Sequence, residues 1–116
     1  MLVDDEDGVR AVAARMLMRA GYEVLEARDG AEAAVAALNR QPAVVVTDLE
    51  MPVMNGLEAT SLIREREGRI GRHTPVVAVT STTDQERCFA VGMDAYIAKP
   101  LSPDVLSATM EQVLGI

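Results

Sequence analysis

The fold of this chain is organised around residues 43–59, which read AVVVTDLEMPVMNGLEA. The three valines at 44–46 predict a buried strand, because β-branched residues favour extended backbone. Asp48 follows at the carboxyl end of that strand, and residues 52–56 are typical of a turn before a helical pattern opens at Leu57. Ligands bind beyond the carboxyl ends of strands in an open α/β sheet, so Asp48 is a candidate site residue. An aspartate in this place is equally typical of a loop or a helix cap.

The composition indicates one small acidic domain. The 116 residues are enough for a single core, and we expect one domain over residues 1–116. Eighteen acidic and eleven basic residues give a formal net charge of −7, which disfavours direct binding to nucleic acid. The single cysteine, Cys88, excludes an internal disulfide, and its helix-forming neighbours predict a packed, inert thiol.

The hydrophobic segments are all short. No apolar run reaches the length that crosses a bilayer, and the first residues have no signal-peptide pattern. We therefore expect a soluble, cytoplasmic domain that makes no membrane contact of its own. The first strand is very short, at residues 1–3, which suggests that leading residues are missing or that the domain comes from a longer chain.

Predicted strands and helices alternate five times. Strands are expected at residues 1–3, 22–27, 44–48, 75–80 and 95–98. Helices are expected over about residues 9–20, 31–38, 57–67, 83–92 and 102–114. Apolar positions 9, 12, 13, 16, 17 and 20 give the first helix one buried face, and Asp29 with Glu32 and Thr83 with Glu86 are capping-box patterns. This alternation predicts an α/β fold with a parallel sheet covered by helices on both sides.

Polar residues mark the carboxyl ends of four predicted strands. Right-handed crossovers and a switch in strand order would bring the ends of the first, third, fourth and fifth strands to one edge of the sheet. Those ends carry Asp4, Asp5, Asp48, Thr80 and Lys99. The sequence therefore predicts one chemical site at this edge.

These residue types together suit phosphoryl transfer onto a carboxylate. Carboxylates about 5 Å apart repel by roughly 3 kcal/mol per pair at an effective dielectric near 20, and a divalent cation removes that cost. Oxygen ligands without a His or Cys cluster favour Mg²⁺. Asp48 can ligate the metal with one oxygen and attack phosphorus with the other, while Thr80 and Lys99 contact the incoming oxygens. Taken singly, Asp4 and Asp5 are better interpreted as a solvated cap of the first helix, and Lys99 as a surface charge.

Four motifs in order resemble those of response-regulator receiver domains. They are VDDE at 3–6, TDLEMPVMNG at 47–56, AVTS at 78–81 and YIAKP at 96–100. The resemblance covers essentially the whole chain and lacks only the usual leading residues of the first strand. It implies a flavodoxin-like, doubly wound α/β fold with five parallel strands in the order 2-1-3-4-5 and five helices.

The resemblance also implies a role for each residue at the predicted site. Asp48 matches the phosphoacceptor, and Asp4 and Asp5 match the acidic pair that serves Mg²⁺. Thr80 matches the switch hydroxyl, and Lys99 matches the lysine that binds the phosphoryl group.

Three further positions take roles from the same resemblance. Tyr96 matches the aromatic residue of the switch, and the bond from Lys99 to Pro100 is expected to be cis. The backbone carbonyl of Glu50 matches a metal ligand. The Glu50 side chain is left with two alternatives, because it can point to solvent or crowd the phosphoryl group.

By the same resemblance the chain is a phosphoprotein of a two-component phosphorelay rather than a conventional enzyme. Its expected partners are a sensor histidine kinase, which supplies the phosphoryl group, and an effector or histidine phosphotransfer domain, which responds to it. EMPVMNGLEAT and CFAVGMDAYIAKPL look most like receiver domains attached to hybrid histidine kinases. That similarity implies onward transfer to a phosphotransfer domain.

Three other interpretations compete with this one. A phosphatase of the haloacid dehalogenase type needs an aspartate where this chain has Glu50, and also a cap insertion. A flavodoxin-like flavin binder needs a phosphate loop after the first strand, where this chain is acidic, and aromatic residues, of which it has few. A degenerate receiver that acts only as an interaction module is disfavoured by the intact set of site residues. His73 lies in a polar connection, which favours an exposed loop histidine over a catalytic base.

Overall fold

The computed structural model describes residues 1–51, 54–81 and 85–116. Within these residues five parallel strands form one sheet in the order β2-β1-β3-β4-β5. The strands are β1 (Leu2–Val3), β2 (Glu26–Ala27), β3 (Val45–Asp48), β4 (Val76–Thr80) and β5 (Ala95–Ala98). The helices are α1 (Asp7–Arg19), α2 (Gly30–Arg40), α3 (Gly56–Gly68), α4 (Gln85–Ala90) and α5 (Pro103–Leu114). The predicted fold class and strand order are confirmed.

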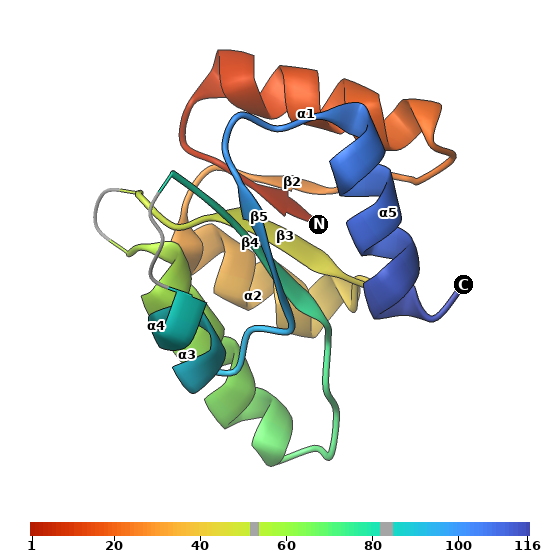
Figure 1. Ribbon diagram of the computed structural model, residues 1–116. Helices are drawn as coiled ribbons and strands as arrows, with labels where there is room; N and C mark the ends of the chain where they lie inside the picture. The colour runs from red at the N-terminus through yellow and green to blue at the C-terminus, as the bar shows by residue number, and fades with distance from the viewer. Residues whose placement is uncertain (52–53, 82–84) are drawn as a thin grey trace.

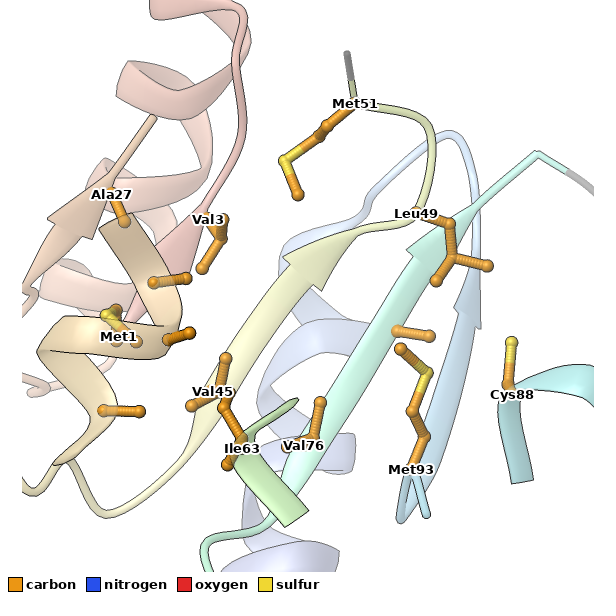
Figure 2. Packing of buried hydrophobic residues seen from close by; sticks show 14 residues of the cluster. Met1, Val3, Ala27, Val45, Leu49, Met51, Ile63, Val76, Cys88 and Met93 are labelled. Atoms are coloured by element: carbon orange, nitrogen blue, oxygen red, sulfur yellow. The ribbon is translucent and has the colours of Figure 1, made fainter. Parts of the chain in front are cut away.

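The sheet lies between two layers of helices. Helices α1 and α5 cover one face, and α2, α3 and α4 cover the other (Figure 1). Successive strand residues point to opposite faces, so Val45 packs with Ile63 of α3 while Val46 packs with Leu106 of α5. Figure 2 shows the first of these two cores, where side chains from β1, β3 and β4 meet those of α2, α3 and Cys88 of α4. Both faces of the sheet are therefore buried, as expected for parallel strands.

The register of the strands brings their polar ends together. Val3 lies opposite Thr47, so Asp4 leaves β1 beside Asp48. Thr80, the last residue of β4, lies opposite Ala98, so Lys99 follows β5 directly beside the end of β4. The strand order reverses between β1 and β3, and this switch point is where a doubly wound fold leaves a crevice.

Two predicted elements differ from the structure. The second strand is confined to Glu26–Ala27, although Leu2 N still donates to Leu25 O at 2.7 Å. This strand lies at the edge of the sheet beside β1. The predicted strand residues before Glu26 therefore have few inter-strand hydrogen bonds to hold them extended. The apolar face of α1 is buried only in part, since Val9 is 46% exposed and Val12 is 53% exposed.

Among the described residues, side chains cap α2, α3 and α5, which the sequence partly predicts. Asp29 accepts a hydrogen bond from Glu32 N at 2.8 Å, as its capping pattern predicts, and Ser102 accepts one from Val105 N at 3.2 Å at the start of α5. The predicted capping pair of Thr83 and Glu86 lies outside the described residues, because the structure does not describe Thr83. In the described part of the chain, no helix combines the length and apolar character that spanning a membrane requires.

Candidate functional site

Three carboxylates gather at the switch point of the sheet. Asp4 and Asp5 follow β1, Asp48 ends β3, and one oxygen from each lies within 4.8 Å of the others. Asp4 and Asp48 are buried, whereas Asp5 is exposed. The predicted acidic cluster is therefore present, with two members desolvated and one facing solvent.

Asp4 is held by the start of α1. Its Oδ1 accepts a hydrogen bond from Glu6 N at 2.9 Å, and its carbonyl oxygen accepts one from Arg10 at 2.8 Å. Arg10 also bonds to Glu26 of β2 and to Asp7. Asp4 therefore binds the segment just before α1 without capping the helix, because the N-cap is Glu6 and no side chain caps it. Arg10 anchors the acidic loop in a way that sequence reasoning missed.

The carboxylate of Asp48 is fixed by two donors. Its Oδ1 accepts from Lys99 Nζ at 3.1 Å and from Glu50 N at 3.2 Å. Burial raises the pKa of Asp48 above its ordinary value, and the hydrogen bond from Lys99 opposes this shift without cancelling it. The nearby charge of Asp4 adds to the increase in the pKa. Asp48 therefore carries its negative charge at an energetic cost, which a bound cation would relieve.

Lys99 supplies the positive charge beside this cluster. Burial alone would lower the pKa of Lys99, but the hydrogen bond to Asp48 and the charges of Asp48, Glu50 and Asp4 outweigh burial and raise it. Its Nζ also lies 3.7 Å from Glu50 Oε2. The peptide bond from Lys99 to Pro100 is cis, as predicted. Lys99 is thus a permanent cation at neutral pH, aimed at Asp48.

Thr80 and Glu50 are joined by a hydrogen bond next to Asp48. Thr80 is fully buried at the end of β4, and its Oγ1 donates to Glu50 Oε1 at 2.8 Å. Glu50 reaches this contact from the loop after β3. Of the two alternatives for the Glu50 side chain, the structure selects the one that crowds the site.

Gly56 holds this loop close to the end of β3. A Cβ atom at position 56 would lie 2.6 Å from the carbonyl oxygen of Asp48, so only glycine fits there. Gly56 N also donates to Leu49 O at 3.1 Å. Asn55 and Glu58 form a complete capping box at the start of α3, which the sequence analysis did not identify. These contacts hold the start of α3 against the end of β3, and Glu50 lies in the loop between them.

A cavity of about 850 Å³ opens beside the site. Its polar end is formed by Asp4, Asp48 and Lys99, and its apolar walls come from α1, β1, β3, β4 and the start of α5. The exposed Val9 and Val12 belong to these walls, which explains why part of the predicted apolar face of α1 does not reach the core.

The donor set fits a hard divalent cation. Three carboxylate oxygens within 4.8 Å of one another, without a neutral nitrogen or sulfur donor in the cluster, are the ligand type that Mg²⁺ prefers. Burial and, to a smaller extent, the charge of Asp4 raise the pKa of Asp48 and so disfavour its ionised form, and a bound cation would relieve both effects. Asp4, Asp5 and Asp48 are therefore the residues that would hold Mg²⁺.

The remaining candidate residues lie apart from this cluster. Tyr96 of β5 is half-buried and packs against the core shown in Figure 2. Cys88 is buried, as predicted. His73 is exposed, as predicted, and its Nε2 lies 2.8 Å from Asp94 Oδ1 near the amino ends of β4 and β5.

Comparison with known proteins now decides the family. The sequence model of the response regulator receiver domain matches residues 1–111. The chain belongs to this family. Receiver domains are signalling modules of two-component systems and not conventional enzymes. The match favours the receiver interpretation over the phosphatase and the flavin binder.

Relatives of this receiver domain match over nearly its whole length. The polar-differentiation response regulator DivK of Brucella ovis is 33% identical over 118 residues, which cover 99% of this chain and 94% of DivK. Chemotaxis protein CheY4 of Vibrio cholerae has a similar structure, with a TM-score of 0.88 at 34% identity over 97% of this chain and 95% of CheY4.

A second similar structure contains a metal ion. It is the receiver domain of sensor histidine kinase PA1611 from Pseudomonas aeruginosa, with a magnesium ion coordinated in its active site cleft. It matches this chain with a TM-score of 0.88 and 32% identity, over 99% of this chain and 95% of that domain.

Proposed function

We propose that this receiver domain accepts a phosphoryl group on Asp48 in a Mg²⁺-dependent reaction. The observation that carries the proposal is the placement of Asp48, which lies in the acidic cluster and accepts a hydrogen bond from Lys99. The excess negative charge supports binding of a cation, and Lys99 supports binding of a phosphoryl anion. Thr80 lies on the neighbouring strand, with its hydroxyl directed to the same space.

The transfer itself needs few protein groups. An oxygen of Asp48 forms a bond to phosphorus, the bond from phosphorus to the donor nitrogen breaks, and its electron pair returns to the donor imidazole. Mg²⁺, when bound, neutralises charge on the nucleophile and on the transferred group. Lys99 holds the phosphoryl oxygens electrostatically, and the Thr80 hydroxyl donates a hydrogen bond to one of them.

The phosphoryl group is then signalled through Thr80 and Tyr96. Donation from Thr80 to a phosphoryl oxygen draws the end of β4 toward Asp48, and Tyr96 on β5 lies beside β4 in the sheet. One charge-assisted hydrogen bond contributes about 1.5 to 3 kcal/mol, enough to shift a two-state equilibrium by roughly tenfold to a hundredfold. The proposed output is a rearranged surface around α4, β5 and α5.

The proposed partners follow from the family. The donor is the phosphohistidine of a sensor histidine kinase, and the receiver passes its signal to an effector or to a histidine phosphotransfer domain. The motifs that resemble hybrid kinases favour the second route. We place this reaction in the cytoplasm, without direct contact to nucleic acid or membrane.

Intact-mass measurement tests the assignment of Asp48. Wild type and Asp48→Asn are incubated with acetyl phosphate and Mg²⁺ and then weighed. We expect the mass of one phosphoryl group on wild type only, and none on either protein when a chelator replaces Mg²⁺, because the metal must offset the charge of both reactants. A phosphoryl mass gain on the Asn variant would overturn the assignment. A wild type that stays unmodified with both acetyl phosphate and a phosphorylated kinase would support the degenerate receiver instead.

A further inference from the structure

Glu50 places a carboxylate where a phosphoryl group would bind. Its Oε1 accepts the hydrogen bond of Thr80 Oγ1 at 2.8 Å, and its Oε2 lies 3.7 Å from Lys99 Nζ. Lys99 is at the same time bonded to Asp48 at 3.1 Å. One side chain thus engages both groups that the proposed reaction assigns to the phosphoryl oxygens.

The chemistry of the two anions is alike at these contacts. A carboxylate and a phosphoryl group both present negatively charged oxygens to a hydroxyl donor and an ammonium group. Thr80 has one hydroxyl proton to donate, so its donation to Glu50 excludes donation to a second oxygen. The charge of Glu50 also disfavours the approach of another anion to the same space.

We infer that the Glu50 carboxylate is a resident competitor for the phosphoryl site, which must leave Thr80 and Lys99 before phosphate on Asp48 can engage them. The inference rests on the proposed function, and it goes beyond that function by making Glu50 a positioning residue that restrains phosphorylation. The Glu50 side chain is 46% exposed, so it can turn into solvent without breaking the fold. Competition of this kind slows the reaction and leaves it possible.

The exposure of Glu50 limits the size of the effect. When a charge-assisted hydrogen bond of a half-exposed side chain breaks, hydrogen bonds to water partly replace it. We expect removal of the carboxylate to raise the initial rate of phosphorylation by about threefold to tenfold, and tenfold corresponds to about 1.4 kcal/mol. Affinity for beryllofluoride, which mimics the phosphoryl group, is expected to rise by a similar factor.

Three variants test the inference. Glu50→Ala removes the competing group, and Glu50→Gln keeps its shape and removes its charge. Glu23→Ala is the matched control, because Glu23 is exposed in the segment that leads into β2 and its loss changes the net charge equally. Initial rates with acetyl phosphate and Mg²⁺ are followed by intact mass, and beryllofluoride affinity is followed by amide chemical shifts.

The expected order of rates is Glu50→Ala, then Glu50→Gln, then wild type together with Glu23→Ala. Equal rates and affinities in all four proteins would overturn the inference while leaving phosphorylation of Asp48 intact. A slower Glu50→Ala variant would overturn it also, since Glu50 would then assist the reaction. A wild type that takes up neither phosphoryl group nor beryllofluoride would show that the proposed function itself fails.

The Thr80→Val background shows whether the competition acts through the hydroxyl. Val keeps the shape of Thr80 and cannot donate a hydrogen bond, so Glu50 would compete there only through Lys99. The gain from Glu50→Ala is therefore expected to be clearly smaller in Thr80→Val than in the wild-type background. An undiminished gain would contradict competition for Thr80.

Discussion

Charged side chains cluster at both edges of the sheet, and the two clusters are built in opposite ways. At the carboxyl edge, Asp4, Asp5 and Asp48 share one nearby lysine. At the amino edge, a second cluster gathers around Arg64 of α3 and joins it to Glu67 and to Asp94, which precedes β5. The first cluster has an excess of negative charge, whereas in the second cluster acidic and basic side chains are paired.

The pairing in the second cluster is geometrically complete. Arg64 donates twice to Gly92 O, and once each to Asp94, Glu67 and Thr74 O, which uses all five of its N–H groups. Glu67 is only 3% exposed, and its other oxygen accepts from the backbone and hydroxyl of Thr74. This cluster ties the loop before β4 to the turn before β5.

Hydrogen bonding alone does not distinguish the two clusters. Among the described residues, no buried side-chain nitrogen or oxygen lacks a hydrogen-bond partner. The difference lies in net charge. Lys99 is shared by several acids, whereas Glu67 and Asp94 are matched by Arg64 and by Arg72, whose Nε lies 3.8 Å from Glu67 Oε2. Removing one partner of a buried, compensated pair is costly, whereas uncompensated charge is what a cation-dependent site requires.

The largest expected effect is on the compensated cluster. Arg64→Ala leaves Glu67 buried without its closest cation, so we expect a loss of about 3 kcal/mol in the free energy of unfolding. Urea unfolding followed by circular dichroism measures it. The control is Arg69→Ala, because Arg69 pairs with Glu65 at 3.4 Å and both side chains are exposed. That exposed pair is expected to contribute less than about 0.5 kcal/mol.

The two arginine variants can also contradict the claim that the buried pair contributes more to stability than the exposed pair. Equal losses in Arg64→Ala and Arg69→Ala would show that burial of Glu67 does not make its pairing important. A loss in Arg64→Ala that Glu67→Gln relieves in the double variant would strengthen the interpretation, because the uncompensated charge would then be the cause.

The Arg64 cluster was outside the reach of sequence reasoning. No sequence pattern links its members. Arg64 and Glu67 look like the solvated face of a helix, and Thr74 and Asp94 look like loop residues. The polar connection around residues 68–74 gave no signal of burial. Glu67 is an interior residue because α3 lies against the segments that precede β4 and β5, as the hydrogen bonds of Glu67 to Thr74 and of Arg64 to Gly92 show.

The carboxyl edge was predictable because its residues end successive strands. The alternation of strands and helices placed Asp48, Thr80 and Lys99 on one edge, and the motifs assigned them roles. The orientation of the Glu50 side chain was undecided, since sequence does not say which rotamer a loop carboxylate takes. The anchoring of Asp4 by Arg10 was missed, because it depends on how α1 crosses the edge of the sheet.

A smaller effect, of opposite sign, is expected at the acidic cluster. In the presence of a chelator, Asp48→Asn is expected to stabilise the protein by about 1 kcal/mol, or roughly 4 °C in Tm. Burial and the charge of Asp4 oppose the ionised form, and Lys99 compensates only in part. Thermal unfolding of the variant and of wild type measures the difference, with Glu23→Gln as a control for net charge.

The pH dependence of this difference has a defined sign. The pKa of Asp48 is raised in the folded state above its ordinary value of 3.8, so the folded protein binds that proton more readily than the unfolded chain. Wild-type stability therefore falls as pH rises through the window between those two pKa values. The advantage of Asp48→Asn should be complete above the window and should vanish as pH falls below it. An advantage that persists unchanged in acid would exclude ionisation of Asp48 as the cause.

The smallest effect on stability is expected at the exposed member of the cluster, and it separates stability from metal binding. Asp5 shares the cluster but faces solvent, so water and salt screen its repulsion of Asp4 and Asp48. Asp5→Asn is therefore expected to stabilise the metal-free protein by less than about 0.5 kcal/mol. Its affinity for Mg²⁺ is expected to fall on the order of tenfold, because one of three anionic ligands is lost. The increase of Tm with Mg²⁺ concentration reports that affinity. If Asp5→Asn keeps the wild-type response to Mg²⁺, Asp5 is a solvated loop carboxylate and the metal is held without it.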